Sequence, residues 1–464
     1  MNHVHLIAVC GTGMSALAGM FKEKGFRVTG SDQNVYPPIS DILNEQGIEI
    51  RVGYKPENLV DKPDLVIVGN AVSRNNPEIE ALLQSKIPYL SMPQALKEFF
   101  LKGKKKIVIA GTHGKTTTSS IAAWVLEACG KDPGFLIGGI PNNFERNYKL
   151  GKGEFFVIEG DEYDTAFFDK GPKFLHYEPD VAILTSVEFD HADIFKDFSH
   201  VEEAFKKFIK MIPAEGKLIA CAEDSNVMKL FGDASCLKET YGINSEAHWK
   251  IKSIKANWEQ DFTISRNGGI LGKGTTSLLG RHNLLNLLGV FAALMSLNLS
   301  MEDIISGIKT FKGIRRRQEV VGEENGITII DDFAHHPTAV RETIGAFRES
   351  YPQRRIWAVF EPRSNSSRRN IFEKEYSEAF SEADKIIIAG VYNSGLLDNE
   401  IRFSPQRVVD MLRKKDKDAF CIEKVDDIIN HLIKNLKKDD IVLIMSNGGF
   451  GGIHRKLLEA LRTL

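Results

Sequence analysis

Short apolar runs alternate with helix-patterned stretches along the first hundred residues of this chain. Residues 5–9 have the pattern of a buried strand, and residues 26–30 and 64–68 are predicted as the second and third strands. A glycine-bearing turn at residues 11–16 opens a helix that ends near Lys24. Buried strands separated by helices are typical of a doubly wound parallel sheet. The N-terminal part of the chain is therefore predicted to be an α/β domain of Rossmann type.

The same alternation returns twice further along the chain. Apolar runs lie at residues 106–110, 155–159, 181–185 and 217–220, and again at residues 328–330, 356–360, 385–388 and 441–444. Between the two sets, β-favouring segments around Asn267-Gly268-Gly269 predict antiparallel hairpins, and an apolar helix is predicted over residues 284–297. At 464 residues the chain is long enough for three domains. We predict three α/β domains at residues 1–104, 105–314 and 315–464, with the lysine-rich residues 102–106 as an exposed linker.

Residues 110–118, Ala-Gly-Thr-His-Gly-Lys-Thr-Thr-Thr, join an apolar strand to a helix-patterned stretch. Such a loop points successive backbone N–H groups at one place, and the helix dipole adds partial positive charge there. Lys115 can reach the outer phosphates of a nucleotide, and the Thr116 hydroxyl can bind Mg²⁺. The loop is tighter than the usual phosphate loop, since Gly111 lies only three residues before Gly114. We predict a phosphate-binding loop, the alternative being a glycine-rich turn.

Acidic residues follow two of the predicted strands. Glu159 directly ends an apolar strand, so that it is favoured as an Mg²⁺ ligand at the carboxyl edge of the sheet. For Asp161, Glu162 and Asp164, which come next, a solvated acidic loop is an equally good interpretation. His191, in a second polar cluster, is either a metal ligand or a surface histidine.

Three further motifs suggest ligand contacts. Gly11-x-Gly13, with an acid at Asp32 after the next strand, fits the dinucleotide fingerprint and predicts a phosphate-bearing ligand. His282 and Asn283 could stack on and hydrogen-bond an adenine, but Asn283 could equally cap the helix. The arginine-rich residues 361–369 could bind carboxylates or phosphates, or form a charged surface loop.

Composition narrows the class of protein. The formal net charge of −2 gives no support for a nucleic-acid or lipid-surface partner. The five cysteines are scattered and none are paired as C-x-x-C, which favours a reducing compartment. The longest apolar region, residues 284–299, is too short and too interrupted to span a bilayer. We therefore expect a cytoplasmic protein with no membrane partner.

Taken in order, these motifs resemble those of the Mur ligase family, ATP-dependent amide-forming enzymes of bacterial wall synthesis, over nearly the whole chain. The matching segments are Gly-x-Gly-Met-Ser at 11–15, residues 110–118, Glu159 before Asp-Glu-x-Asp, Asp190-His-x-Asp193, Gly280-Arg-His-Asn-x-x-Asn286, Arg316-Arg317 and Asp-Asp-Phe-Ala-His-His-Pro at 331–337. The resemblance implies an N-terminal Rossmann-like domain for a UDP-sugar, a central P-loop ATPase-like domain with an antiparallel portion, and a C-terminal Rossmann-like domain for a peptide.

Two branches of that family have an N-terminal domain of this kind. One adds L-alanine to UDP-N-acetylmuramate, and the other adds the murein tripeptide L-alanyl-γ-D-glutamyl-meso-diaminopimelate to the same sugar nucleotide in peptidoglycan recycling. The segments that resemble the tripeptide-adding branch are residues 34–38, residues 162–170 with 174–177, and residues 360–365. The alanine-adding branch usually has Arg where this chain has Ser364. The resemblance therefore favours the tripeptide as substrate, with L-alanine as the alternative.

The family roles carry over to matching positions. ATP is expected to bind Gly111, Thr112, His113, Gly114, Lys115, Thr116, Thr117, His282, Asn283, Asn286, Arg317 and Asp332. Two Mg²⁺ ions are expected, one held by Thr116 and Glu159 and the other by Glu159 and His191, with Lys115, Glu159 and His191 as the catalytic residues. The UDP end of the sugar nucleotide is expected at Gly11, Thr12, Gly13, Met14, Ser15, Asp32 and Ser73. The peptide is expected at Arg363, Ser364 and Asn365.

Two other classes of protein compete with a ligase. An NAD-dependent oxidoreductase would explain Gly11-x-Gly13 and Asp32 but would leave the loop at Lys115 unexplained. A nucleotide-gated binding protein would not need the candidate metal ligands Glu159 and His191. We therefore expect a ligase that acts as a monomer or weak homo-oligomer on the sugar nucleotide, the tripeptide and ATP, and a modified lysine at 206, 207 or 210 remains open.

Overall fold

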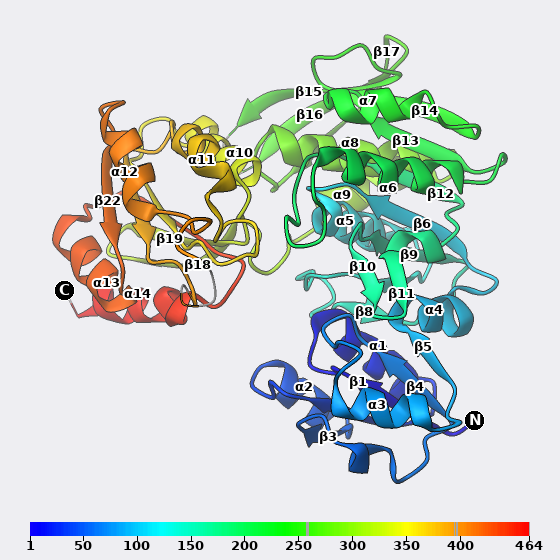
Figure 1. The fold of residues 1–464 in the computed structure, drawn as a ribbon. Coiled ribbons are helices and arrows are strands. Elements are labelled where there is room, and N and C mark those ends of the chain that lie inside the picture. The colour runs from blue at the N-terminus through cyan, green and yellow to red at the C-terminus, as the bar shows by residue number, and fades with distance from the viewer. Residues whose placement is uncertain (257–258, 394, 396–397, 464) are drawn as a thin grey trace.

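In the computed structural model, which describes residues 1–256, 259–393, 395 and 398–463, the chain forms three α/β lobes (Figure 1). The first lobe has a five-stranded parallel sheet in the order β3-β2-β1-β4-β5. Its elements are β1 (His3–Ile7), α1 (Thr12–Glu23), β2 (Arg27–Asp32), α2 (Ile39–Glu45), β3 (Glu49–Val52), β4 (Leu65–Val68), α3 (Pro77–Gln84), β5 (Tyr89–Ser91) and α4 (Met92–Leu96). The predicted doubly wound sheet is confirmed.

The first strand begins earlier than its apolar residues indicate. β1 starts at His3, whose buried ring atom Nε2 lies 2.9 Å from Thr29 Oγ1, and it ends at Ile7, because Ala8 has a φ of +68°. A histidine is tolerated in a core when its ring is hydrogen-bonded. The predicted strand over residues 5–9 was therefore wrong in its bounds, since an apolar pattern does not reveal a polar residue that is paired inside the core.

The central lobe has a ten-stranded sheet in the order β17-β16-β15-β14-β13-β12-β6-β9-β7-β8. Its elements are β6 (Lys105–Ala110), α5 (Lys115–Ala128), β7 (Gly134–Leu136), β8 (Tyr148–Lys149), β9 (Phe155–Gly160), β10 (Asp164–Ala166), β11 (Asp169–Pro172), β12 (Val181–Leu184), α6 (Phe198–Lys210), β13 (Lys217–Cys221), α7 (Ser225–Phe231), β14 (Leu237–Gly242), β15 (Trp249–Ala256), β16 (Gln260–Arg266), β17 (Gly269–Thr276), α8 (Arg281–Ser296) and α9 (Met301–Lys309). β10 and β11 form a separate hairpin.

Two predictions for the central part of the chain, the antiparallel hairpins and the exposed linker, can be compared with the structure. β16 and β17 pair antiparallel through a two-residue turn at Asn267 and Gly268, both with positive φ, which matches the right-handed twist of a hairpin. The predicted hairpins are confirmed. The predicted linker at residues 102–106 is wrong in part, because β6 already begins at Lys105 and pairs with Phe155.

The C-terminal lobe has a six-stranded sheet in the order β18-β19-β23-β20-β21-β22, parallel except for the edge strand β18. Its elements are β18 (Glu319–Glu324), β19 (Ile327–Asp332), α10 (Pro337–Ser350), β20 (Ile356–Phe360), α11 (Glu373–Ala379), β21 (Lys385–Ala389), α12 (Pro405–Arg413), β22 (Asp418–Ile422), α13 (Val425–Asn435), β23 (Ile441–Met445) and α14 (Ile453–Arg462). The predicted three-domain α/β class is confirmed, and the boundaries 1–104, 105–314 and 315–464 stay a prediction.

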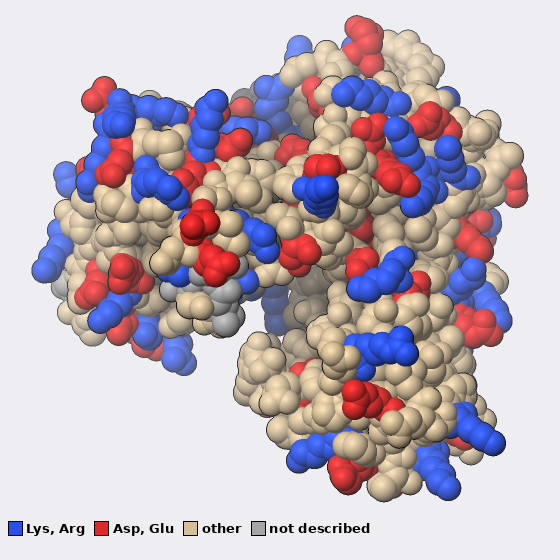
Figure 2. Space-filling model, viewed as in Figure 1, with Lys and Arg blue, Asp and Glu red and all other residues tan. Residues whose placement is uncertain are grey.

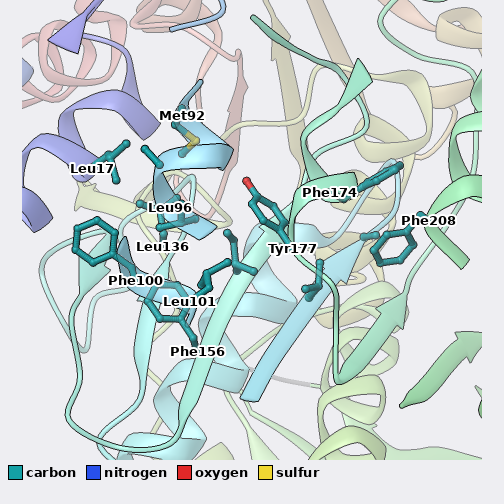
Figure 3. Packing of buried hydrophobic residues seen from close by; sticks show 14 of the residues in the cluster. Leu17, Met92, Leu96, Phe100, Leu101, Leu136, Phe156, Phe174, Tyr177 and Phe208 are labelled. Carbon is teal, nitrogen blue, oxygen red and sulfur yellow. The ribbon is translucent and has the colours of Figure 1, made fainter. Parts of the chain in front are cut away.

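The N-terminal and central lobes share one apolar core. Figure 3 shows Leu17, Met92 and Leu96 packed toward Leu136 and Phe156, and the same buried cluster continues to Phe208 on α6. Gly19 on α1 has no room for a Cβ, because the Tyr148 ring of β8 lies directly against it. A continuous core holds two lobes in a fixed relation.

The C-terminal lobe has its own apolar clusters on the two faces of its sheet, and Leu279 is the one residue of the central lobe in them among the described residues. Its side chains instead meet the central lobe through polar contacts, such as Ser366 Oγ to Asp190 Oδ1 at 2.6 Å. Polar interfaces within a chain are typical of domains that move relative to one another. Figure 2 shows a hollow between the C-terminal and N-terminal lobes, and acidic and basic side chains mixed over this face.

None of the helices in the described part of the chain is both long and apolar enough to cross a lipid bilayer.

Candidate functional site

A cavity of about 920 Å³ lies between the central and C-terminal lobes. On the side of the central lobe the cavity is lined by the loop between β6 and α5. On the side of the C-terminal lobe it is lined by residues that follow β19 and β20. Eleven of the twelve predicted ATP residues line this cavity, all except Gly111: Thr112, His113, Gly114, Lys115, Thr116, Thr117, His282, Asn283, Asn286, Arg317 and Asp332. His191, Ser364 and Asn365 also line it. Residues as far apart in the sequence as Thr112 and Asn365 thus meet at one volume large enough for a nucleotide.

Two glycines give the loop between β6 and α5 its shape. Gly111 has φ +136°, and a Cβ there would overlap the Thr185 hydroxyl. Gly114, the residue before α5, has φ +82°, and a Cβ there would lie 2.6 Å from Asn286 Oδ1. Positive φ and close approach both require glycine. The loop is therefore held against β12 on one side and α8 on the other.

Replacing Gly114 with alanine is expected to reduce nucleotide affinity at least tenfold, because it combines left-handed strain of about 1–2 kcal/mol with a clash at Asn286. Binding of a fluorescent ATP analogue measures this. Gly130→Ala is the matched control, since Gly130 has φ +70° but nothing within 4 Å of a Cβ. Equal affinity in the two variants would show that the Asn286 contact does not shape the loop.

Lys115 lies at the start of α5 and points back over the loop. Its Nζ donates to Gly111 O at 2.5 Å and to Glu162 Oε2 at 2.9 Å. Burial opposes the charged form, but the carboxylates of Glu162 and Asp161 outweigh it and raise the pKa of Lys115. The lysine is therefore a fixed positive charge on the floor of the cavity.

Glu159, at the end of β9, lies beside Thr116. Its Oε1 accepts the Gly138 N–H at 2.6 Å, and its Oε2 accepts the Thr116 hydroxyl at 3.2 Å. Burial, with the neighbouring Asp161 charge, raises the pKa of Glu159. A carboxylate and a hydroxyl at this spacing are hard oxygen donors that fit Mg²⁺, and a bound cation would remove the cost of the buried negative charge. The structure thus brings together the first predicted pair of metal ligands.

Glu162 is buried, which its place in an acidic cluster did not indicate. Its side chain is 2% exposed and lies between Lys115 and His191, whose Nε2 is 3.5 Å from Glu162 Oε1. The solvated-loop interpretation is therefore wrong for Glu162. Burial would raise the pKa of this carboxyl, but Lys115 and His191 outweigh burial and lower the pKa. The sequence left its role open because buried and solvated acids look alike in a Gly-Asp-Glu motif.

His191 lies in the loop after β12 with its imidazole over this acid. Burial lowers its pKa, but the bond to Glu162 and the charge of Asp190 outweigh burial and raise the pKa. In this arrangement its ion pair is with Glu162, and the predicted pairing of Glu159 with His191 around a second ion stays a prediction.

The predicted adenine residues lie on the first turn of α8. Burial lowers the pKa of His282 to about 4, so its imidazole is uncharged at neutral pH and suited to stacking. Asn283 donates to Leu279 O at 2.8 Å and to Gln318 Oε1 at 3.2 Å, and Asn286 donates to Asn283 Oδ1 at 3.3 Å. The residue before the helix is Gly280, so the alternative that Asn283 caps the helix by accepting a backbone N–H is wrong.

The C-terminal lobe presents Arg317 and Asp332 to the same cavity. The guanidinium of Arg317 lies over the Phe333 ring, 4.6 Å from its centroid. Asp332 accepts the backbone N–H groups of Gln318 at 2.8 Å and Ala334 at 2.7 Å. Burial raises the pKa of Asp332, while Arg317 partly offsets it. Arg317 and Asp332 thus line the cavity from the C-terminal lobe, while the phosphate-type loop lines it from the central lobe.

The predicted UDP-sugar residues lie away from this cavity, at the carboxyl edge of the N-terminal sheet. Thr12, Gly13 and Ser15 open α1, Gly11 precedes it, and Ser73 is exposed after β4. Asp32 accepts backbone N–H groups from Cys10 and Asn34, both at 2.9 Å, so it braces the turn after β1. The Met14 side chain is buried in the core, so only its main chain can contact a ligand.

Of the three residues predicted to bind the peptide, two line the cavity and one does not. Ser364 and Asn365 line the cavity, and Asn365 donates to Asp193 Oδ2 at 2.8 Å across the domain boundary. The Arg363 guanidinium instead lies over Tyr392, 3.6 Å from the ring centroid, in a space that a side chain at Gly448 would fill. Its contact with a peptide stays a prediction.

Sequence analysis missed several residues that line the cavity. They are Glu188, Thr338, Ser366, His335, His336, Gln318, Glu223 and Asn447. Of these, Ser366 lies within the noted segment 361–369, His335 and His336 lie within the noted motif 331–337, and Glu188 lies in the polar cluster of His191. Nothing in the pattern showed that they would meet the phosphate loop. The lysines left open for modification do not line the cavity: Lys206 and Lys207 are on α6, paired with Glu202 and Glu203.

A phosphate-type loop, a neighbouring carboxylate pair and a second lobe closing over both define a nucleotide-dependent enzyme of three α/β domains. Three family models match the chain: the Mur ligase family catalytic domain at residues 3–103, the Mur ligase middle domain at 109–294 and the Mur ligase glutamate ligase domain at 316–448. The chain belongs to the Mur ligase family, which confirms the resemblance drawn from its motifs.

Individual relatives cover nearly the full chain. The UDP-N-acetylmuramate–L-alanyl-γ-D-glutamyl-meso-2,6-diaminoheptandioate ligase of Escherichia coli (strain K12) is 40% identical, over 99% of this chain and 98% of its own length. The UDP-N-acetylmuramate–L-alanine ligase of Clostridium tetani is 34% identical, over 97% and 96%. The crystal structure of a murein peptide ligase from Psychrobacter arcticus matches with a TM-score of 0.74 and 35% identity, over 100% of this chain and 99% of that one.

Proposed function

We propose that this protein is an ATP-dependent ligase that joins L-alanyl-γ-D-glutamyl-meso-diaminopimelate to UDP-N-acetylmuramate with Mg²⁺, in peptidoglycan recycling. The observation that carries the proposal is the cavity between the two lobes, where the phosphate loop, Glu159 and the C-terminal residues Arg317 and Asp332 converge. Full-length similarity to a ligase with this substrate supports the choice of reaction.

The chemistry requires activation of a carboxylate, because its direct displacement by an amine would expel oxide. In the proposed reaction an oxygen of the sugar's lactyl carboxylate attacks the γ-phosphorus of ATP, and ADP leaves. The peptide's α-amine then attacks the acyl carbon, and phosphate leaves. Lys115 would neutralise charge on the transferring group, and Mg²⁺ at Thr116 and Glu159 would supply electrostatic stabilisation there.

The proposed placement of the substrates on separate lobes supports a requirement that the C-terminal lobe closes before the reaction. The sugar nucleotide is proposed at the N-terminal edge near Gly11 and Ser73, which shares a core with the central lobe. ATP is proposed at the loop near Lys115, and the peptide at Ser364 and Asn365 on the lobe with polar contacts. Chemistry then waits until the C-terminal lobe brings the amine to the acyl phosphate, which limits wasteful ATP hydrolysis.

The choice of the tripeptide over L-alanine rests on identity and on the loop after β20. Identity is 40% to the tripeptide-adding relative and 34% to the alanine-adding one. Ser364 forms hydrogen bonds with Ser367 within its own loop. The described residues of this loop that line the cavity, Ser364, Asn365 and Ser366, are all uncharged. The segment 162–177 bears on this choice less directly, because its Phe167 and Phe168 pack on the N-terminal lobe.

Phosphate release with UDP-N-acetylmuramate, ATP and either amine tests the proposal. One charge-assisted hydrogen bond to a peptide carboxylate contributes about 1.5–3 kcal/mol, so kcat/KM is expected to favour the tripeptide at least about tenfold. A preference for free L-alanine would instead establish the alternative, and release of no phosphate with either amine would contradict a ligase.

A further inference from the structure

Three side chains from three segments meet where the phosphate loop faces the C-terminal lobe. They are His113 in the loop, Glu188 after β12 and His336 before α10, and we call them the bridging cluster. His113 Nε2 lies 3.2 Å from Glu188 Oε2, and His336 Nδ1 lies 3.6 Å from the same oxygen. One ligand atom of each residue lies within 4.8 Å of the other two.

The donor set selects a class of cation. Two imidazoles and a carboxylate suit zinc and its transition-metal neighbours, whereas Mg²⁺ prefers oxygen ligands. A tetrahedral ion with bonds of about 2.0–2.1 Å holds its donors about 3.3 Å apart. The spacings from Glu188 to His113 and to His336, 3.2 and 3.6 Å, lie on either side of that value. The two imidazole donors lie within 4.8 Å of each other, so binding an ion would bring them closer by about 1.5 Å at most.

The protonation states of Glu188 and His336 also suit metal binding. Burial would raise the pKa of Glu188, but hydrogen bonds from His113 and Thr338 and the nearby imidazoles lower it to about 2. Burial and the neighbouring His113 lower the pKa of His336 to about 4. At neutral pH the carboxylate is therefore ionised and His336 is neutral, which are the forms that ligate a cation.

A supporting shell is already present around these ligands. The Thr338 hydroxyl donates to Glu188 Oε2 at 2.8 Å, as outer partners of a ligating carboxylate do. The His336 ring packs against Phe372, and its side chain is 7% exposed. His336 Nδ1 also accepts the Thr338 N–H at 3.3 Å, a long helix-capping bond that a metal bond would replace.

We propose that the bridging cluster binds a divalent cation of the zinc class, separate from the Mg²⁺ proposed at Thr116 and Glu159. Its ligands come from both lobes, since His113 and Glu188 belong to the central lobe and His336 to the C-terminal lobe. A bound ion would therefore fasten the C-terminal lobe to the phosphate loop. The proposal does not depend on which amine the enzyme uses.

The test is a Zn²⁺ titration by calorimetry on metal-free full-length protein, in saturating Mg²⁺. One Zn²⁺ per chain is expected in the wild type, with affinity reduced at least about tenfold in H336N and in E188Q. Asn is a preferred capping residue, so H336N removes the imidazole while keeping the start of α10. With Co²⁺ as the probe, the visible absorption of a four-coordinate site is expected in the wild type and lost in H336N.

Two controls separate this site from other zinc binding. H191A removes a proposed Mg²⁺ ligand, and H200A removes an exposed histidine that pairs with Asp197 at 3.0 Å. Both are expected to keep the bound Zn²⁺. The proposal is overturned if the wild type binds no Zn²⁺, if H336N and E188Q bind it as the wild type does, or if H191A is the variant that loses it.

Discussion

Lys115→Ala is expected to lower kcat by about 10²–10³-fold or more, the usual cost of removing one preorganised charge-stabilising donor. The reason is positional, because Lys115 Nζ lies at the mouth of the loop, 2.5 Å from Gly111 O. Single-turnover phosphate transfer measures the chemical step apart from product release. A rate within a few-fold of the wild type would contradict the role of Lys115 at the phosphates.

The same substitution is also expected to lower stability, which the sequence did not indicate. A loop lysine has no core to support, but here it is the partner of the buried Glu162 at 2.9 Å. Leaving that carboxylate without the lysine costs about 1–3 kcal/mol. The double variant K115M/E162Q removes both charges, so its melting temperature should recover while its activity stays lost.

A matched control for Lys115 is Lys170→Ala. Lys170 pairs with Asp164 at 3.0 Å on the exposed β10–β11 hairpin, where an ion pair contributes little. Both its activity and its melting temperature should match the wild type. Loss of activity in K170A equal to that of K115A would show that the assay reports a general effect of lost positive charge.

Glu159→Gln is expected to raise the Mg²⁺ concentration for half-maximal rate at least about tenfold. Even the loss of a residue that only hydrogen-bonds a metal ligand usually weakens metal binding by this much. The amide oxygen can still accept the Gly138 N–H, now 2.6 Å from Glu159 Oε1, so the loop geometry is kept. What is lost is the negative charge beside Thr116. A Mg²⁺ titration of the initial rate, at saturating ATP, measures the shift.

Asp164→Asn is the control for Glu159, because it removes a charge from the same acidic segment but at a side chain that is 36% exposed and pairs with Lys170. Its Mg²⁺ titration should overlay that of the wild type. If E159Q and D164N shift equally, or if neither shifts, then the carboxylate at Glu159 does not ligate the ion, and the Mg²⁺ site must be sought among Asp161 and Glu162.

Much of the local structure was predictable because it is encoded in adjacent residues. The apolar run before Gly111 and the helix pattern after Lys115 define a strand, a loop and a helix without reference to the rest of the chain. The turn at Asn267-Gly268 is similarly local, since both residues tolerate positive φ. The bounds of β1 were wrong because the partner that makes His3 acceptable in a core, Thr29, lies 26 positions away.

The sequence by itself determined three α/β domains, the phosphate-type loop and membership of the Mur ligase family, because ordered local motifs carry that information. Only the tertiary structure decided that Lys115 pairs with Glu162, that Ser366 reaches Asp190, and that His113, Glu188 and His336 meet. Those contacts join segments 47 to 176 positions apart, or three separate segments at once. They depend on how sheet edges and lobes pack, and no local pattern of hydrophobic and polar residues specifies that.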